Sequence, residues 1–190
     1  WTDIDGMHNN DPRIVDKTRP IAVMSFDEAA ELAYFGAKIL HPASIWPAQQ
    51  FNVPVKLLNT MQPEAHGTLI KAEVASRGVK AIAAKDGITA IKIKSSRMLL
   101  AYGFLRKVFE IFELGTFCSV EVDRDQTIIC IVGNMVSESK GAIQSVIDSL
   151  IEYPVRMVSF GGSRHNVSVL VDSKFKKEAL QSLNQDLFTW

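Results

Sequence analysis

A repeated strand–loop–helix pattern in the second half of the chain constrains its fold more than any other feature. The first copy has an apolar strand over residues 88–93, a loop, and a helix that we expect to begin at Gly103. The second copy has a strand over 127–132, a loop, and a helix expected to begin near Gly141. In both copies a bulky apolar pair follows the glycine at the same spacing. Such shared spacing indicates two duplicated small domains.

The two copies continue differently along the chain. The second runs on into a strand over 155–160, an antiparallel strand over 165–171 and a helix over 174–187, which gives a β-α-β-β-α order. The first passes from its helix at Glu113 directly to a new strand over 118–122. Either this unit is shortened, or the sequence lacks a segment just after Glu113. We favour a missing segment because a strand–helix pair alone cannot cover its own apolar faces.

The first part of the chain has a different pattern, with one strong helix signal. Ser25 and Glu28 are spaced as a capping box, and apolar residues recur every three or four positions as far as Leu40. We expect this helix to end at His41, because Pro42 disfavours the helical conformation of the residue before it. Helices that alternate with short strands indicate an α/β layer. The other elements expected here are a helix over 43–49, strands over 53–58 and 67–70, and a charged connector over 71–80.

Charge and composition exclude several classes of partner. The chain has 21 Lys and Arg against 21 Asp and Glu, so its formal net charge is zero. A neutral chain has no general attraction for nucleic acid or for anionic membranes, and no apolar run approaches the roughly 20 residues that span a bilayer. The start at Trp1 has neither an initiator Met nor a signal-peptide pattern, so we expect an internal stretch of a cytoplasmic protein. Cys118 and Cys130 lie in apolar runs, which favours reduced core thiols over disulfides or metal ligands.

Three positions in the first part of the chain carry side chains suited to a phosphate site. Asp3 lies near a predicted strand end, Arg13 closes an Asp-Pro-Arg sequence, and Lys38 lies in the predicted helix. A carboxylate there would meet Mg²⁺ or a ribose, and the two cations would neutralise phosphate charge. Each position also has an ordinary structural explanation, since Asp-Pro-Arg is typical of a turn and lysine is often exposed at a helix end. Spacing alone does not decide between the two.

Other patterns that carry chemistry are absent from the sequence. It has no P-loop, no Gly-x-Gly-x-x-Gly and no Gly-x-Ser-x-Gly motif. His41 and His165 have no partners at metal-ligand spacing, so we expect no metal site. The loops that lead to Gly103 and Gly141 offer free backbone N–H groups to the carboxylate of a small ligand, although an ordinary strand-to-helix loop has the same pattern.

Taken together, the motifs of the chain resemble those of aspartate kinases. Residues 1–13 match the signature WTDxxGxxxxDPR, and the match continues in the expected order through residues 26–29, 35–42 and 67–70. The repeat resembles the tandem ACT regulatory domains of the same enzymes. The fold implied is a partial amino-acid-kinase α/β domain followed by two ferredoxin-like βαββαβ ACT domains, the first incomplete.

The resemblance also implies a domain order. Residues 1–78 would be the C-terminal part of the kinase domain. Residues 79–95 and 114–190 would form the second ACT domain, with the start of the first ACT domain, residues 96–113, inserted between them. The strand near 81–93 would then pair with residues 116–188 rather than with its sequence neighbour. ACT units in this family pair edge to edge, which covers strand edges, so a homodimer is expected.

The activity implied by the resemblance is transfer of the ATP γ-phosphate to the β-carboxylate of aspartate, at the start of lysine, threonine and methionine synthesis, with Mg²⁺ as a charge neutraliser. The chain ends where single-function members stop. The family's catalytic and aspartate-binding residues would precede Trp1, so we expect this stretch alone to be inactive. The nucleotide contacts implied are Thr2 and Asp3, Arg13 at the phosphates, Lys38 and Ile39 near the adenine or phosphate, and His8, which stands where the family usually has Tyr.

Feedback control by an amino acid is the second implication of the resemblance. Lysine-sensitive members bind their effector in the first ACT domain, and we expect lysine rather than threonine. Two alternatives remain: an amino-acid-sensing module without catalysis, and an amino-acid kinase that acts on a different carboxylate. The Asp-Pro-Arg and Phe-Gly-Ala-Lys motifs argue against the latter. The effector contacts implied are Met98, Ala101, Gly103, Phe104 and Leu105, of which Ala101 departs from the polar residues of some members.

Overall fold

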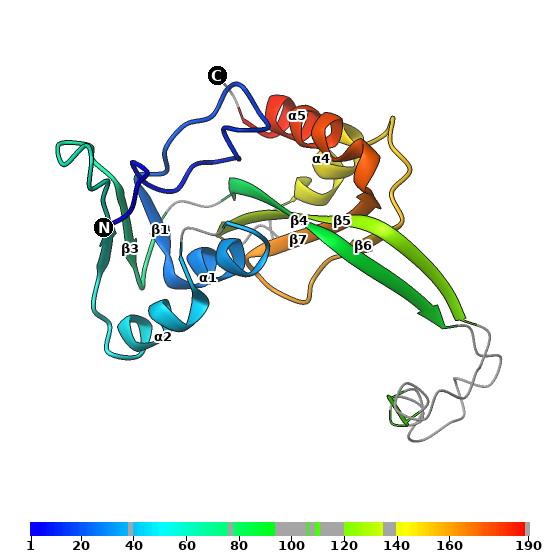
Figure 1. Cartoon of the computed structure of the whole chain (residues 1–190), viewed down its shortest axis with the longest axis horizontal. Helices are drawn as coiled ribbons and strands as arrows, with labels where there is room; N and C mark the ends of the chain where they lie inside the picture. Colours follow the sequence, from blue (N-terminus) through cyan, green and yellow to red (C-terminus); the bar gives the residue numbers. More distant parts are fainter. Residues whose placement is uncertain are drawn as a thin grey trace.

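The structure is a computed structural model, and it contains two β-sheets. It describes residues 1–37, 40–75, 78–93, 106, 109–110, 120–134 and 140–188. A three-stranded sheet and a four-stranded sheet lie next to each other, with helix α1 (Phe26–Tyr34) between them (Figure 1). The mixed α/β and α+β class expected from the sequence is confirmed.

The three-stranded sheet belongs to the first part of the chain. Its central strand β3 (Thr68–Lys71) pairs in parallel with β1 (Val23–Ser25) and antiparallel with β2 (Val55–Leu57). Helix α1 follows β1 directly, and α2 (Pro42–Gln50) packs beside it. The short second helix and both strands predicted for this part are therefore confirmed, with β2 shorter than predicted and β3 shifted by one residue.

The four-stranded sheet is antiparallel throughout. Its order is β4 (Gly78–Ile93), β5 (Val120–Asn134), β7 (Asn166–Asp172) and β6 (Met157–Ser159). The expected pairing of residues 81–93 with a strand far downstream is confirmed, because β4 pairs with β5 along most of its length.

Two helices complete the predicted β-α-β-β-α run. Helix α4 (Ala142–Ser149) begins after Gly141, whose φ of 81° is left-handed, and this confirms the predicted helix start. Helix α5 (Lys176–Leu187) follows a 3₁₀ turn, η3 (Ser173–Phe175), so it begins slightly later than expected. Both helices cover the same face of the four-stranded sheet (Figure 1).

Two strand predictions were wrong in their bounds. The described residues of the strands expected over 118–122 and 127–132 are parts of one continuous strand, β5. Asp125, with a left-handed φ of 53°, lies at a register shift opposite β4, and the pairing resumes on both sides of it. The connector expected over 71–80 is shorter, since β4 already begins at Gly78. Long pairing between β4 and β5 overrides the local polarity of both stretches.

The part of the four-stranded sheet near residues 81–83 and 129–132 is buried on both faces, and this gives the molecule its layered core. Side chains of alternate residues on β4 and β5 point to opposite faces. Ile82, Ile129 and Ile131 pack against α4 and α5. The other face packs against Ala29 and Leu32 of α1. Helix α1 thus shares one core with both sheets. The sheet residues on this second face are Ala81, Ala83, Cys130 and Val132.

Helix α1 begins as predicted and ends earlier. The Ser25 Oγ accepts from the Glu28 backbone N–H at 3.1 Å, and the Glu28 Oε2 accepts from the Ser25 N–H at 2.7 Å, which confirms the capping box. The predicted continuation to Leu40 was wrong, because the helix ends at Tyr34. Gly36 has a φ of 119°, and a Cβ built on it would lie 2.4 Å from the carbonyl oxygen of Ala84 on β4. This close approach turns the chain away from the helix axis.

Part of the first repeat copy can be compared with the prediction. Arg106, Phe109 and Glu110 are helical, within the stretch expected to form a helix. The start of that helix at Gly103 and the junction after Glu113 lie outside the described residues. So does Cys118, whereas Cys130 is buried, as expected for a core thiol.

Candidate functional site

The N-terminal segment is fixed to the three-stranded sheet by backbone hydrogen bonds. The Thr2 N–H donates to the Leu58 carbonyl at 2.9 Å, and the Thr60 N–H donates to the Thr2 carbonyl at 2.7 Å. These bonds place Thr2 and Asp3 just beyond the end of β2. The Thr2 hydroxyl bonds to the backbone of Ile4, so it closes a local turn, whereas the Asp3 side chain is exposed. The Asp3 carboxylate is therefore the freer of the two to meet a ligand.

His8 is held in one orientation by both ring nitrogens. Its Nε2 lies 2.9 Å from the Asp5 Oδ1, and its Nδ1 lies 3.1 Å from the Thr18 Oγ1. The side chain keeps one fifth of its surface exposed. Both ring nitrogens are therefore engaged within the N-terminal segment. A planar ring fixed in this way is suited to stacking.

Arg13 lies in the turn that its Asp-Pro-Arg sequence predicted. The Asp11 carbonyl accepts from the backbone N–H groups of Ile14 and Val15, both at 3.0 Å. The Arg13 guanidinium makes two hydrogen bonds to the Asp11 carboxylate, at 2.9 and 2.7 Å. The hydrogen bond from Arg13 lowers the pKa of Asp11 below its ordinary value. The Arg13 side chain is 84% exposed, so an anion in solution can reach its remaining N–H groups.

The structure places the candidate nucleotide residues only in part. Thr2, His8 and Arg13 lie on one N-terminal segment, and the contacts described above join each of them to different neighbours. Lys38 and Ile39 lie outside the described residues. So do all five candidate effector residues, Met98, Ala101, Gly103, Phe104 and Leu105.

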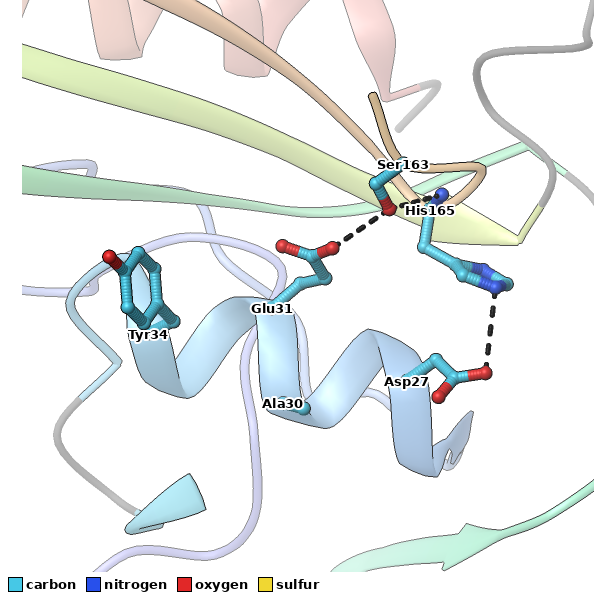
Figure 2. A pocket seen from close by; sticks show the side chains of 6 residues that line it. All are labelled: Asp27, Ala30, Glu31, Tyr34, Ser163 and His165. Atoms are coloured by element: carbon cyan, nitrogen blue, oxygen red, sulfur yellow. Dashed lines mark hydrogen bonds and ion pairs between the residues drawn. The ribbon is translucent and has the colours of Figure 1, made fainter. Parts of the chain in front are cut away.

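A polar contact between α1 and the β6–β7 hairpin was not predicted from the sequence. The Glu31 carboxylate accepts from the Ser163 Oγ at 2.8 Å and from the Asn166 Nδ2 at 2.5 Å. One turn earlier, the Asp27 Oδ2 lies 3.6 Å from the His165 Nε2. Figure 2 shows Asp27 and Glu31 pointing from α1 toward this hairpin. The contact closes one side of a shallow cavity of about 400 Å³ lined by Asp27, Ala30, Glu31, Tyr34, Ser163 and His165.

A weak signal for this contact exists in the sequence. Asp27, Glu31 and Tyr34 are spaced four and three residues apart, so they share one polar face of a helix whose opposite face is apolar. The partner loop, however, has the composition of a plain hairpin turn. Nothing in its residues indicates which surface it contacts.

A buried ion pair joins the same helix to β4. The Lys80 Nζ lies 2.8 Å from the Glu28 Oε2, the Glu28 side chain is fully buried and the Lys80 side chain is 11% exposed. The Glu28 Oε2 also accepts from the Ser25 N–H, so one carboxylate oxygen serves both the helix cap and the second sheet. Helix α1 is thereby fixed to the four-stranded sheet by charge as well as by apolar packing.

Asparagines join the N-terminal segment to α5 on the other face of the four-stranded sheet. The Nδ2 groups of Asn9 and Asn10 both lie 3.4 Å from the Asn184 Oδ1. The Asn184 Nδ2 in turn donates to the Lys17 carbonyl at 3.0 Å, and the Asn9 carbonyl accepts from the Ile82 N–H of β4 at 2.8 Å. The candidate nucleotide segment is thus hydrogen-bonded to both β4 and α5.

Among the residues that the structure describes, no three His, Cys, Asp or Glu side chains gather as they would around a metal ion. None of the helices in this described part has the length and apolar character needed to cross a membrane.

Two family models match the chain. Residues 1–59 match the amino acid kinase family, and residues 129–187 match an ACT domain. The lysine-sensitive aspartokinase 3 of Escherichia coli (strain K12) is 30% identical over 229 aligned positions, which cover 99% of this chain and 51% of that protein. The chain therefore spans about half the length of this relative. Since 229 positions exceed the 190 residues of the chain, the relative has residues inside the aligned stretch that this chain lacks.

Solved structures are similar over the whole chain. The crystal structure of E. coli aspartokinase III with aspartate and ADP, in the R-state, has a TM-score of 0.90 at 29% identity and covers all of this chain and 52% of that one. The structure of aspartokinase III with lysine and aspartate, in the T-state, has a TM-score of 0.83 at 30% identity, with 100% and 51% covered. The similarity is thus greater to the R-state.

Proposed function

Since this chain belongs to the aspartokinase family, with a C-terminal kinase part followed by an ACT domain, we propose that it is the feedback-regulated part of an aspartate kinase. The enzyme would transfer the ATP γ-phosphate to the β-carboxylate of aspartate in the cytoplasm, at the start of lysine, threonine and methionine synthesis. The observation that carries this proposal is the TM-score of 0.90 to a kinase solved with aspartate and ADP, over the full length of this chain.

The proposed domain order follows the sheets. Residues 1–78 would be the kinase part, residues 79–95 and 114–190 the second ACT domain, and residues 96–113 the start of the first. The pairing of β4 with β5 supports this order, because it joins the strand before the proposed insertion to the strand after it. The aligned stretch that is longer than the chain supports an incomplete first ACT domain.

The N-terminal segment would contact the nucleotide. The exposed Arg13 guanidinium, oriented by Asp11, would neutralise phosphate charge, and the fixed ring of His8 would stack on the nucleotide. Asp3 would approach the ribose or the Mg²⁺ that accompanies the phosphates. Mg²⁺, when bound, would reduce the charge on the transferred phosphoryl group. Thr2, Lys38 and Ile39 would complete the nucleotide contacts.

Regulation would act through lysine and through a homodimer. The effector would bind at Met98, Ala101, Gly103, Phe104 and Leu105 of the first ACT domain. Within the described part of the chain β6 pairs only with β7, and it carries the exposed apolar side chains of Met157 and Val158. A second copy pairing along this edge would cover both the strand edge and these side chains. Lysine would then favour one arrangement of the dimer and lower kinase activity.

The test is aspartate phosphorylation by the full-length enzyme. Aspartate, ATP and Mg²⁺ are supplied, and aspartyl phosphate is trapped as its hydroxamate. We expect product from the full-length enzyme, less product with lysine, and none from residues 1–190 alone. Absence of product from the full-length enzyme would contradict the kinase assignment. Product from residues 1–190 alone would contradict the placement of the catalytic residues before Trp1.

A further inference from the structure

We infer that Glu31 and the β6–β7 hairpin form a coupling joint, through which the state of the regulatory sheet reaches the nucleotide segment. The joint is defined as Glu31 with Ser163 and Asn166. This inference rests on the proposed function for its regulatory meaning and on the described contacts for its geometry. Nothing in the spacing of the sequence brings these residues together, because Glu31 and Asn166 are 135 positions apart.

Helix α1 contacts the four-stranded sheet through two carboxylates, Glu28 and Glu31, which differ in burial. At Glu28 the attachment is fully buried, so breaking it would leave an uncompensated charge in the core. At Glu31 the carboxylate is only half-buried and bonds to Ser163 in the loop after β6 and to Asn166 at the start of β7, so water can replace these partners when the hairpin shifts. The helix is therefore fixed at its first turn and releasable one turn later.

The loop side of the joint connects to the edge of the sheet. Ser163 lies in the loop after β6, and Asn166 is the first residue of β7, where it pairs with Val132 of β5. Among the described residues β6 has one partner strand, β7, and it carries exposed apolar side chains. Pairing of a second copy along this edge would act on the β6–β7 hairpin, which carries both donors. Figure 2 shows that the Ser163 hydroxyl and the Glu31 carboxylate meet directly, so a shift of the loop changes this contact first.

The helix side of the joint connects to the candidate nucleotide residues. After Glu31 the helix continues for one turn to Tyr34, and Gly36 then turns the chain against β4. The proposed nucleotide contacts Lys38 and Ile39 follow immediately. The Lys85 Nζ of β4 lies 4.9 Å from the centre of the Tyr34 ring, so the end of the helix also contacts the sheet. A release at Glu31 thus acts on the turn that precedes Lys38.

The first arm of the test measures local opening in the 190-residue chain. Hydrogen exchange is compared in the unmodified chain, in Glu31→Ala and in a loop-side double variant, Ser163→Ala with Asn166→Ala. We expect amides in the second half of α1 to exchange about tenfold faster in both variants, because the charge-assisted bonds are lost. The exposed Glu64, in the loop before β3, supplies the control Glu64→Ala, which removes the same charge and leaves exchange in α1 unchanged. Unchanged exchange in both joint variants would overturn the geometry of the joint.

The second arm measures feedback in the full-length enzyme. In Glu31→Ala and in the loop-side variant we expect the rate of aspartate phosphorylation without lysine to stay within about twofold of the unmodified enzyme. The lysine concentration that gives half inhibition should rise at least about fivefold, which is the lower end of the range for allosteric coupling. If Glu31 had a purely structural role, the activities with and without lysine would fall together and the lysine concentration for half inhibition would stay unchanged. That result would overturn the inference. An unmodified enzyme that makes no aspartyl phosphate would refute the proposed function instead, while the exchange arm would still decide the joint.

Discussion

Replacing Lys80 by methionine tests how strongly the buried ion pair fixes α1 to the four-stranded sheet. The change removes the charge and keeps most of the side-chain volume. The fully buried Glu28 carboxylate then keeps one hydrogen bond, from the Ser25 N–H, while its Oε1 has no partner in the structure as described. Loss of one member of a buried pair costs about 3–5 kcal/mol. We expect the free energy of unfolding to fall by this amount.

The assay is urea unfolding followed by far-UV circular dichroism. With a denaturant slope of about 2 kcal/mol per molar urea, the midpoint falls by about 1.5–2.5 M. The control is Lys177→Met on the exposed side of α5, which we expect to change stability by less than about 0.5 kcal/mol.

A double variant separates the ion pair from simple loss of packing. Glu28→Gln combined with Lys80→Met leaves a neutral amide whose oxygen still accepts from the Ser25 N–H. We expect the double variant to be more stable than Lys80→Met alone by at least about 1 kcal/mol. A loss below about 1 kcal/mol in Lys80→Met, or a double variant no more stable than the single one, would refute this reasoning.

Three further predictions concern a thiol, a carboxylate and a glycine. Burial raises the pKa of Cys130 to about 12, so its thiol should react slowly with an alkylating agent at pH 8. Labelling of the Cys130 peptide, measured by mass spectrometry, should stay at background until urea unfolds the chain, and rapid labelling of the folded chain would contradict this. Burial alone would raise the pKa of Asp86, but hydrogen bonds from Lys176 and Thr127 outweigh it and lower the pKa below 3.8. The stability lost in Lys176→Met should thus be constant above about pH 5 and shrink as the pH falls below about 4; a pH-independent difference would argue against the contact. Gly36→Ala should lower the free energy of unfolding, measured in urea, by about 2–4 kcal/mol, because the new Cβ would meet the Ala84 carbonyl. An unchanged free energy would show that the chain relaxes at this position.

Elements with a local signal were predictable from the sequence. The capping box of Ser25 and Glu28 fixes the start of α1 through bonds between residues three apart, and Gly141 marks the start of α4 by its left-handed backbone. Features that depend on distant residues were not predictable. Helix α1 ends at Tyr34 because Gly36 meets β4, and apolar spacing within the helix carries no information about that contact.

The candidate site divides in the same way. The turn at Arg13 was predicted because Asp-Pro-Arg is a local motif, and the structure adds the two hydrogen bonds to Asp11. The contact of Glu31 with Ser163 was missed, since it joins residues 132 positions apart and depends on how α1 packs on the four-stranded sheet. The roles proposed for the N-terminal residues in nucleotide binding remain predictions.

Regulation is the part of the proposed function that this chain itself would supply, so effector binding tests the account most directly. Calorimetric titration of the full-length enzyme with lysine, and separately with threonine, compares the two candidate effectors. We predict saturable heat with lysine and none with threonine. Heat with neither amino acid would contradict the regulatory role, and heat with threonine alone would contradict lysine as the effector.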